Sequence, residues 1–420
     1  MHRPRLLTLT VCLLAPGFAP GLCLAGDNWP QFRGPDQQGR SDAAGVPVRW
    51  SETQGVRFKT PIPGEGWSSP VVWGKQVWMT TATEDGHSLR AVCVERDGGR
   101  ITHDVEVFHL DALEPKNSFN SYASPTPVLE EGRVYVSFGN YGNACLDTTT
   151  AKPIWKSREL KLDHKEGPGS SPVIYKDLFL LHCDGTDVQY VAALDKHTGK
   201  LAWKTPRTTD FGNRPGDLRK AYDIPLLVTE NGQDRIISVG AYRVFCYDPN
   251  DGREIWSCVT PGFSVVPRPV YADGVVYVCT GFMTPELWAI RTGGTGDVTN
   301  SHVLWKSKQG IPQKPSILLV GSELYFVADT GVARCVDAKT GATLWQHRLE
   351  GKYTASPVYA GGNIYFFSER GLTTVMRPSR TGPEVVAENQ LDGRFMASPA
   401  VVDGAMFLRT DKALYRIDGN

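Results

Sequence analysis

The residues with the clearest potential for chemistry stand at one recurring position in the chain. Eight prolines each precede a short apolar segment: Pro70, Pro127, Pro172, Pro225, Pro269, Pro315, Pro357 and Pro399. The residue before the proline is a small hydroxyl in five cases: Ser69, Thr126, Ser171, Ser356 and Ser398. In the others it is Ile224, Arg268 or Lys314, so two cations replace hydroxyls in consecutive repeats.

Arg268 and Lys314 are therefore predicted to bind an anion. Guanidinium and ammonium groups that converge in a partly dry space attract carboxylates and phosphates. Arg214 lies in a long polar segment, residues 207–222, and is predicted to add a third cation to the same face. The alternative is that Arg268 and Lys314 pair with acids on adjacent loops, such as Asp329 or Asp184, or are solvated.

The elements that must position these residues are copies of one hairpin. In Ala192–Lys204 a turn aspartate can accept hydrogen bonds from its own backbone, and a turn glycine can take positive φ. A tryptophan on the second strand is too large to bury within one hairpin, so it must dock on a neighbouring copy. The residues assigned to this docking are Trp155, Trp203, Trp256, Trp305, Trp345, Asp195, Gly199, Asp248 and Asp337.

The repeat predicts an all-β fold, an eight-bladed β-propeller of four-stranded antiparallel blades. Four strands in about 45 residues is the signature of a propeller blade. The last unit, residues 397–420, has only three strands, and Phe58–Pro61 (FKTP) matches the fourth-strand segment Trp203–Pro206 (WKTP). An N-terminal strand at residues 55–61 is therefore predicted to close the ring and remove the open sheet edges.

The turn-and-tryptophan repeat resembles that of quinoprotein alcohol dehydrogenases, the pyrroloquinoline quinone (PQQ) propellers, and of the outer-membrane barrel-assembly scaffold lipoprotein. Trp29–Gly34 (WPQFRG) also resembles the start of secreted bacterial PQQ-like propellers. The enzymes of this group imply PQQ with a calcium held by Glu, Asn and Asp, an Asp base and a disulfide between adjacent cysteines. No cysteines are adjacent in this sequence. We therefore expect no catalytic residues, no metal ligands and no cofactor, with PQQ and calcium as the alternative.

Two connections between repeats are longer than the rest, residues 109–122 and 207–222. Long loops on a rigid scaffold are where binding usually resides. The sequence therefore favours a non-catalytic binding or scaffold propeller of the bacterial cell envelope, with a protein partner on the face that carries these loops. The alternative function is a PQQ- and calcium-dependent dehydrogenase acting on alcohols or sugars.

The chain is expected to divide into a signal peptide (residues 1–25), an arm (26–47) packed on the outside of the domain, and the propeller (48–420). A short basic start followed by the apolar run Leu6–Leu14 is typical of an export signal, so we expect a periplasmic or secreted protein that is monomeric. With 45 basic and 45 acidic residues, neither nucleic acid nor a transmembrane segment is expected. The seven cysteines after the signal stand at small positions and favour packed free thiols, with a disulfide as the alternative.

Overall fold

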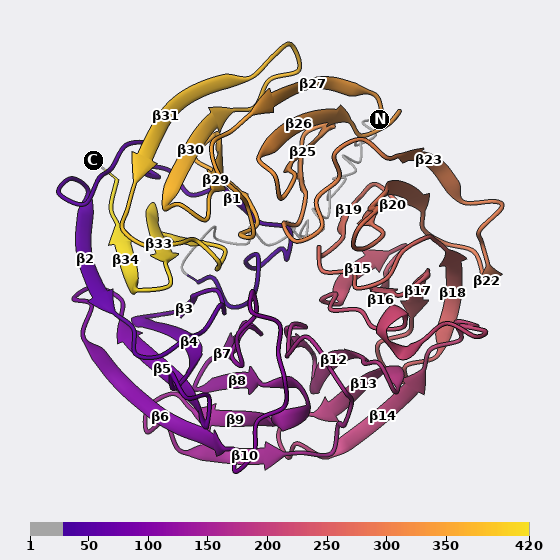
Figure 1. The fold of residues 1–420 in the computed structure, drawn as a ribbon, viewed down its shortest axis with the longest axis horizontal. Helices are drawn as coiled ribbons and strands as arrows, with labels where there is room; N and C mark the ends of the chain where they lie inside the picture. The colour runs from indigo at the N-terminus through magenta and orange to yellow at the C-terminus, as the bar shows by residue number, and fades with distance from the viewer. Residues whose placement is uncertain (1–27, 420) are drawn as a thin grey trace, which may run out of the picture.

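Each repeat folds into one sheet, and eight sheets stand in a ring around a central axis (Figure 1). The computed structural model describes residues 28–419, and the expected signal peptide lies outside this range. All but two of the sheets consist of four antiparallel strands alone, and those two carry an additional short parallel strand. The predicted eight-bladed propeller of four-stranded antiparallel blades is confirmed.

Within each blade the strands follow one another from the axis outward. Blades 1 and 2 contain β3 (Val71–Trp73), β4 (Gln76–Ala82), β5 (Ser88–Glu95), β6 (Ile101–His109), β7 (Val128–Glu130), β8 (Arg133–Ser137), β9 (Asn143–Asp147) and β10 (Pro153–Ser157). Blades 3 and 4 contain β11 (Val173–Tyr175), β12 (Leu178–Asp184), β13 (Gln189–Asp195), β14 (Leu201–Pro206), β15 (Leu226–Glu230), β16 (Gln233–Gly240), β17 (Arg243–Tyr247) and β18 (Glu254–Val259). Blades 5 and 6 contain β19 (Val270–Ala272), β20 (Val275–Cys279), β21 (Leu287–Arg291), β23 (Val303–Ser307), β24 (Leu318–Val320), β25 (Glu323–Val327), β26 (Val332–Asp337) and β27 (Thr343–Arg348). Blades 7 and 8 contain β28 (Val358–Ala360), β29 (Asn363–Phe367), β30 (Leu372–Arg377), β31 (Glu384–Gln390), β32 (Ala400–Val402), β33 (Ala405–Arg409), β34 (Ala413–Ile417) and β2 (Val56–Pro61).

The remaining elements are short. Strand β1 (Arg40–Ser41) runs parallel to β28 on the inner side of blade 7, and β22 (Gly296–Asp297) runs parallel to β18 on the outer side of blade 4. β22 lies in the long connection between β21 and β23 of blade 5, so this connection links blades 4 and 5. The 3-10 helices are η1 (Gly139–Tyr141) and η2 (Gly216–Leu218).

The ring is closed by the N-terminal strand. β2 pairs antiparallel with β34, with Val56 opposite Ile417 and Pro61 opposite Ala413. Its Phe58 packs on the turn of blade 1, where a Cβ added to Gly99 would lie 2.5 Å from the ring. Blade 8 is thus built from both ends of the chain, as the FKTP segment predicts.

The repeated tryptophan docks on the turn glycine of the following blade. A Cβ added to Gly199 would lie 2.5 Å from the Trp155 ring, and one added to Gly252 would lie 2.3 Å from Trp203. Trp155 also donates its indole N–H to the Lys196 carbonyl at 2.7 Å. The turn itself is held by its aspartate, since Asp195 Oδ1 accepts the backbone N–H groups of the two residues that precede Gly199. Trp305 packs on Gly341 in the same way. Trp256 is fully buried, and Trp345 donates its indole N–H to the Ser379 carbonyl.

This packing predicts different costs for two glycines with the same backbone. Gly199 and Gly232 have φ of 72° and 74°, but only Gly199 faces a neighbour within 4 Å. Gly232→Ala should cost roughly 1 kcal/mol of unfolding free energy for the left-handed backbone alone. Gly199→Ala should cost a further 1–3 kcal/mol or so, because its methyl must displace the Trp155 ring. Urea unfolding of both variants measures this, and equal losses would contradict the docking role.

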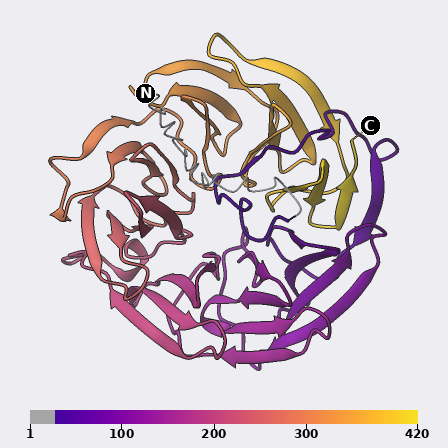
Figure 2. The same cartoon turned by 180° about the vertical axis from the view of Figure 1, so that it is seen from behind.

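The N-terminal arm does not lie on the outside of the domain as expected; it crosses the centre of the ring (Figure 2). Trp29 is only 2% exposed and exchanges both backbone hydrogen bonds with Val72 of the innermost strand of blade 1. Leu129 of blade 2 donates to the Pro30 carbonyl, and Tyr359 of blade 7 donates to Gly39. The inner strands offer unpaired backbone groups toward the axis, and the arm satisfies several of them.

The seven cysteines within residues 28–419 are free and buried, in agreement with packed thiols: Cys93, Cys145, Cys183, Cys246, Cys258, Cys279 and Cys335. Burial raises the pKa of each thiol, to about 11 for Cys93 and Cys335. A thiol with a raised pKa carries little thiolate near neutral pH, so these side chains act as small apolar groups.

Candidate functional site: a cavity at the mouth of the channel

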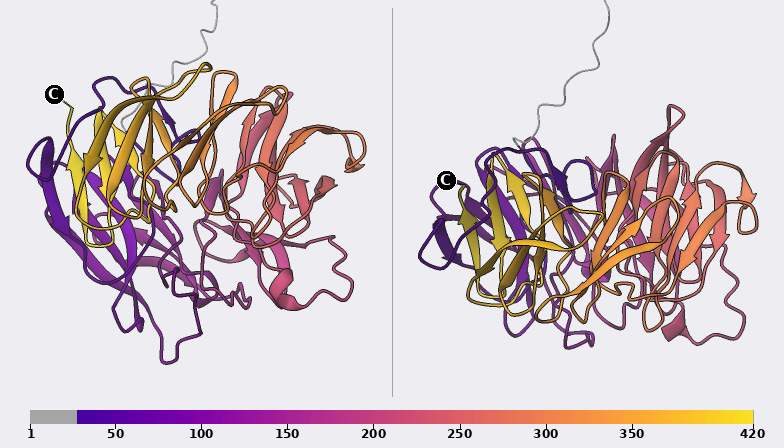
Figure 3. Two further views of the ribbon diagram at one scale, coloured as in Figure 1. Left: turned by 45° about the horizontal axis from the view of Figure 1, so that its top comes forward. Right: turned by 90° about the horizontal axis from the view of Figure 1, so that it is seen from above.

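The segments 109–122 and 207–222 project from one face of the ring (Figure 3). We call this the loop face. A cavity of about 610 Å³ lies at the centre of the ring on this face, with Asn117 and Asp217 of these segments in its lining. The arm contributes Phe32 to the lining, so the arm closes the cavity toward the opposite face. The cavity is therefore a pocket open on one side of the ring.

The inner wall of the pocket is a ring of buried hydroxyl groups that connects neighbouring blades and is interrupted at Ile224 and Arg268. Each hydroxyl accepts a hydrogen bond from the backbone N–H at the equivalent position of the adjacent blade. The distances are 3.0 Å from Arg268 to Ser316, 2.9 Å from Ser316 to Ser356, 2.9 Å from Ser356 to Ser398, 3.0 Å from Ser398 to Ser69, 3.0 Å from Ser69 to Thr126 and 2.8 Å from Thr126 to Ser171. These bonds hold the inner strands at a fixed spacing around the pocket.

The place of Lys314 in this ring was predicted incorrectly, because the repeat of blade 6 is shifted by two residues. Strand β24 begins at Leu318, so Ile317 stands where the other blades have proline and Ser316 takes the hydroxyl position. Pro315 does not open the strand. The preceding Lys314 lies farther out on the wall, where its Nζ is 3.3 Å from Glu369 and 3.7 Å from Asp329. The alternative pairing with Asp329 is therefore what the structure shows.

Arg268 does hold the equivalent position, but its side chain does not enter the pocket. It is 1% exposed and reaches toward the arm, where Nη1 donates to the Phe32 carbonyl at 3.0 Å. Nη2 donates to the Pro225 carbonyl at 2.6 Å and to the Gln37 side chain. The sequence could not reveal this contact, because the arm was expected on the outside of the ring.

The arginines of segment 207–222 do not line the pocket either. Arg214 stacks over Tyr242, with 4.4 Å between the guanidinium carbon and the ring centroid. Arg207 is buried between blades 3 and 4, where it bonds Asp184, His182 and Ser238 at 2.8–3.0 Å. Arg268, Lys314 and Arg214 are thus not brought together. The Ser238, His182 and Asp184 side chains touch, but all three are at most 3% exposed, so no substrate reaches them.

Part of the outer rim of the pocket is apolar and exposed, a feature that was not predicted from the sequence. Phe119 is 67% exposed, Met283 70% and Phe282 48%. Trp67 lies beside Phe119 and donates its indole N–H to the Phe119 carbonyl at 3.1 Å. The signal available in the sequence was Phe119, a large apolar residue inside the polar segment 109–122. Exposed apolar side chains gathered at one mouth mark a binding surface, whereas single ones scattered elsewhere do not.

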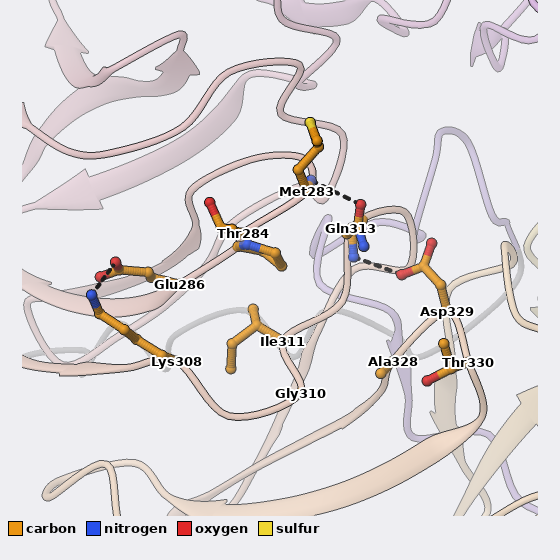
Figure 4. Close-up of a pocket in the computed structure, with 11 residues that line it drawn as sticks. Met283, Thr284, Glu286, Lys308, Gly310, Ile311, Gln313, Ala328, Asp329 and Thr330 are labelled. Carbon is orange, nitrogen blue, oxygen red and sulfur yellow. Dashed lines mark hydrogen bonds and ion pairs between the residues drawn. The ribbon is translucent and has the colours of Figure 1, made fainter.

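A second hollow of about 660 Å³ adjoins the pocket over blades 5 and 6 (Figure 4). The two share a wall made of Met283, Gln313 and Asp329. Gln313 accepts the Met283 backbone N–H at 3.0 Å and gives its own backbone N–H to Asp329 at 2.7 Å. Burial raises the pKa of Asp329.

The lysines of the pocket wall are already paired with acids. Lys314 is matched by two carboxylates, and Lys220 is paired with Asp217 and Glu166, so a tricarboxylate would meet no free cation in this wall. Within residues 28–419 no three His, Cys, Asp or Glu side chains are grouped as a metal site requires. No cysteines there are adjacent, so the disulfide implied by the resemblance cannot form.

The fold and the pocket define a class of protein, the PQQ-like β-propellers, in which blades with docked tryptophans surround a central mouth. Residues 43–222 and 189–418 match the sequence profile described as outer membrane protein assembly factor BamB, and the chain belongs to this family. Within residues 28–419 no helix could cross a bilayer, since the two present have three residues each.

Individual relatives are distant. Tetrathionate hydrolase of Acidithiobacillus ferrooxidans is 24% identical over 268 residues, which cover 52% of this chain and 53% of that protein. This chain thus spans about half the length of that curated relative. BamB from Moraxella catarrhalis superposes with a TM-score of 0.54 at 12% identity, covering 86% of this chain and 100% of that one. The quinohemoprotein alcohol dehydrogenase of Comamonas testosteroni gives 0.67 at 11% identity, covering 93% and 80%. At these identities the superpositions show the fold alone.

Proposed function

We propose that this protein is a non-catalytic binding or scaffold propeller of the bacterial cell envelope. Its partner is a protein that docks on the loop face and inserts an apolar side chain into the pocket. The observation that carries the proposal is the exposed rim of Phe119, Phe282 and Met283 around a pocket with an apolar outer part. Membership of a family described as an assembly factor supports a role in holding other proteins.

The charges around the pocket favour a neutral contact. Lys314 and Lys220 are already paired with acids, so a charged partner group would have to displace an existing ion pair. An apolar side chain of the partner would shield the rim from water, which stabilises the complex by about 25 cal/mol per Å² of apolar surface buried. The hydroxyl ring beneath it offers O–H groups to the carbonyl oxygens of the inserted segment.

The proposal is tested with a photo-crosslinking residue at position 118, an exposed residue of the segment 109–122 next to Phe119, in intact envelopes. Phe119→Asp combined with Met283→Asp should reduce the crosslinked product at least tenfold, since each change places a carboxylate in the apolar contact. The matched control is Leu304→Asp combined with Val385→Asp, which alters exposed apolar residues on β23 and β31. Equal products from both double variants, with unchanged thermal stability, would contradict docking on the loop face.

A PQQ- and calcium-dependent dehydrogenase is the alternative, supported only by likeness of fold to quinoprotein enzymes. Calorimetric titration with PQQ and calcium separates the two functions. Saturable, calcium-dependent heat would favour the dehydrogenase over the scaffold.

A further inference from the structure

Two arginines at the axis are buried without any carboxylate partner. Arg33 of the arm and Arg268 of blade 5 are 2% and 1% exposed. Neither side chain lies within 4 Å of an acid among residues 28–419, although a buried charge is normally paired, as Arg207 is with Asp184. Both reach the same short segment, because Arg268 bonds the carbonyl of Phe32, the neighbour of Arg33.

Both guanidinium groups also keep N–H donors that nothing in the described part of the protein accepts. Arg33 uses Nη2 for the carbonyls of Gln38 and Ile317, while its Nε and Nη1 are buried without a partner. Arg268 uses Nη1 and Nη2, while its Nε is buried without a partner. A buried donor that has no acceptor lowers the stability of the folded protein by roughly 1–3 kcal/mol, and by more when the donor is charged.

The charge at this place is not neutralised by the nearest acids. Burial lowers the pKa of Arg33 and of Arg268 to about 9, and each still carries its proton at neutral pH. Asp36 already bonds Arg40 at 2.8 Å at the exposed edge of the arm. The charge of Asp223 acts on Arg268, but the two form no ion pair, and burial raises the pKa of the Asp223 carboxyl. Water could solvate the free N–H groups, but it would leave both positive charges in place.

A third buried arginine shows that burial alone does not create this situation. Arg409 is 3% exposed and has no carboxylate partner among the described residues. Its Nη1 donates to the carbonyls of Ser68 and Thr80 and to the Ser68 hydroxyl. None of its nitrogens is a buried donor without a partner. Arg33 and Arg268 differ from Arg409 because both keep buried N–H donors that have no partner.

We propose that a small inorganic anion of the size of chloride binds between the guanidinium groups of Arg33 and Arg268. The anion accepts the free N–H groups and offsets the two charges. Since Arg33 also bonds Ile317 of blade 6 and Arg268 bonds Pro225 of blade 4, the bound anion ties the arm to three consecutive blades. It thereby fixes Phe32, the arm residue that lines the pocket.

Thermal unfolding of the full mature chain tests the site. At constant ionic strength, replacing gluconate by chloride or bromide should raise Tm by roughly 2 °C or more and saturate with halide concentration. Arg33→Gln and Arg268→Gln should each abolish this dependence. The control is Arg370→Gln, which removes an exposed arginine paired with Glu350 and should leave the halide effect unchanged.

Crystals of the unaltered protein grown in bromide give an answer that does not depend on the variants folding. An anomalous peak within hydrogen-bond distance of Arg33 Nη1 and Arg268 Nε would establish the site. Equal Tm in all anions, or anomalous density absent from this position, would overturn the proposal and leave the donors to water.

Discussion

Removal of residues 48–62 is expected to abolish cooperative folding of the whole ring. The segment contains β2, the fourth strand of blade 8, and Phe58, which fills the docking place on Gly99 of blade 1. It also carries Trp50 and Ile62, both buried in the cluster that joins blades 7, 8 and 1. Without it, β34 becomes an open edge of blade 8, and the turn of blade 1 loses the ring that packs on Gly99. The ring is then broken at the junction between these two blades. Circular dichroism should show no cooperative thermal transition, and the protein should aggregate.

The matched control carries the same deletion and has the deleted strand added back at the other end of the chain. Asp418 donates its backbone N–H to the Gly55 carbonyl, and Val56 lies opposite Ile417, so the two strands are spaced as in a hairpin. Residues 48–62 attached after residue 419 through a short flexible turn should recover a cooperative transition. A deletion variant that melts cooperatively without this addition would show that β2 is dispensable.

Asp223→Asn is expected to remove much of the pH dependence of stability between pH 4 and pH 8. Asp223 is fully buried beside the hydroxyl ring; Oδ2 accepts the Val239 N–H at 2.7 Å and Oδ1 is without a partner among the described residues. Burial raises its pKa from the ordinary 3.8 to about 8. The folded protein therefore holds a proton that the unfolded chain has released.

The sign follows from this difference. Because the folded-state pKa is raised, the stabilising contribution is complete below about pH 4 and is lost as the pH rises toward 8, by up to about 1.4 kcal/mol per pH unit. The Asn variant cannot release a proton, so its stability relative to the unaltered protein should rise steadily over this interval. Urea unfolding at several pH values measures it, with Asp251→Asn, an exposed carboxylate, as the control. Parallel pH profiles for all three proteins would rule out a buried neutral Asp223.

The fold was predictable from the sequence because its signals are local and repeated. The aspartate and glycine of each turn determine where one hairpin reverses direction. The tryptophan that follows requires a neighbouring blade on which to pack. FKTP at residues 58–61 was recognisable as the missing strand because it repeats a segment of blade 3 almost letter for letter. Blade 6 shows the limit of this reasoning, since Pro315 lies two residues before the position that proline holds elsewhere and only strand pairing reveals the shift.

The site was less predictable, because its residues meet through contacts between distant segments. Arg268 appeared to be a free cation, yet it bonds the carbonyl of Phe32, more than two hundred positions earlier in the chain. Neither residue type nor spacing indicates that an irregular arm will cross the axis. Phe119 and Met283 likewise share a rim only because segments from different blades converge at one mouth.

The pairing of β2 with β34 also sets the order in which the molecule can be completed during synthesis. Val56 is made long before its partner Ile417. Until β34 has been made, β2 has no partner and the circle cannot close. A chain that stops before β34 therefore leaves β2 as an unpaired strand. Quality control can recognise such a strand, so ring closure distinguishes chains that contain both strands from chains that lack one.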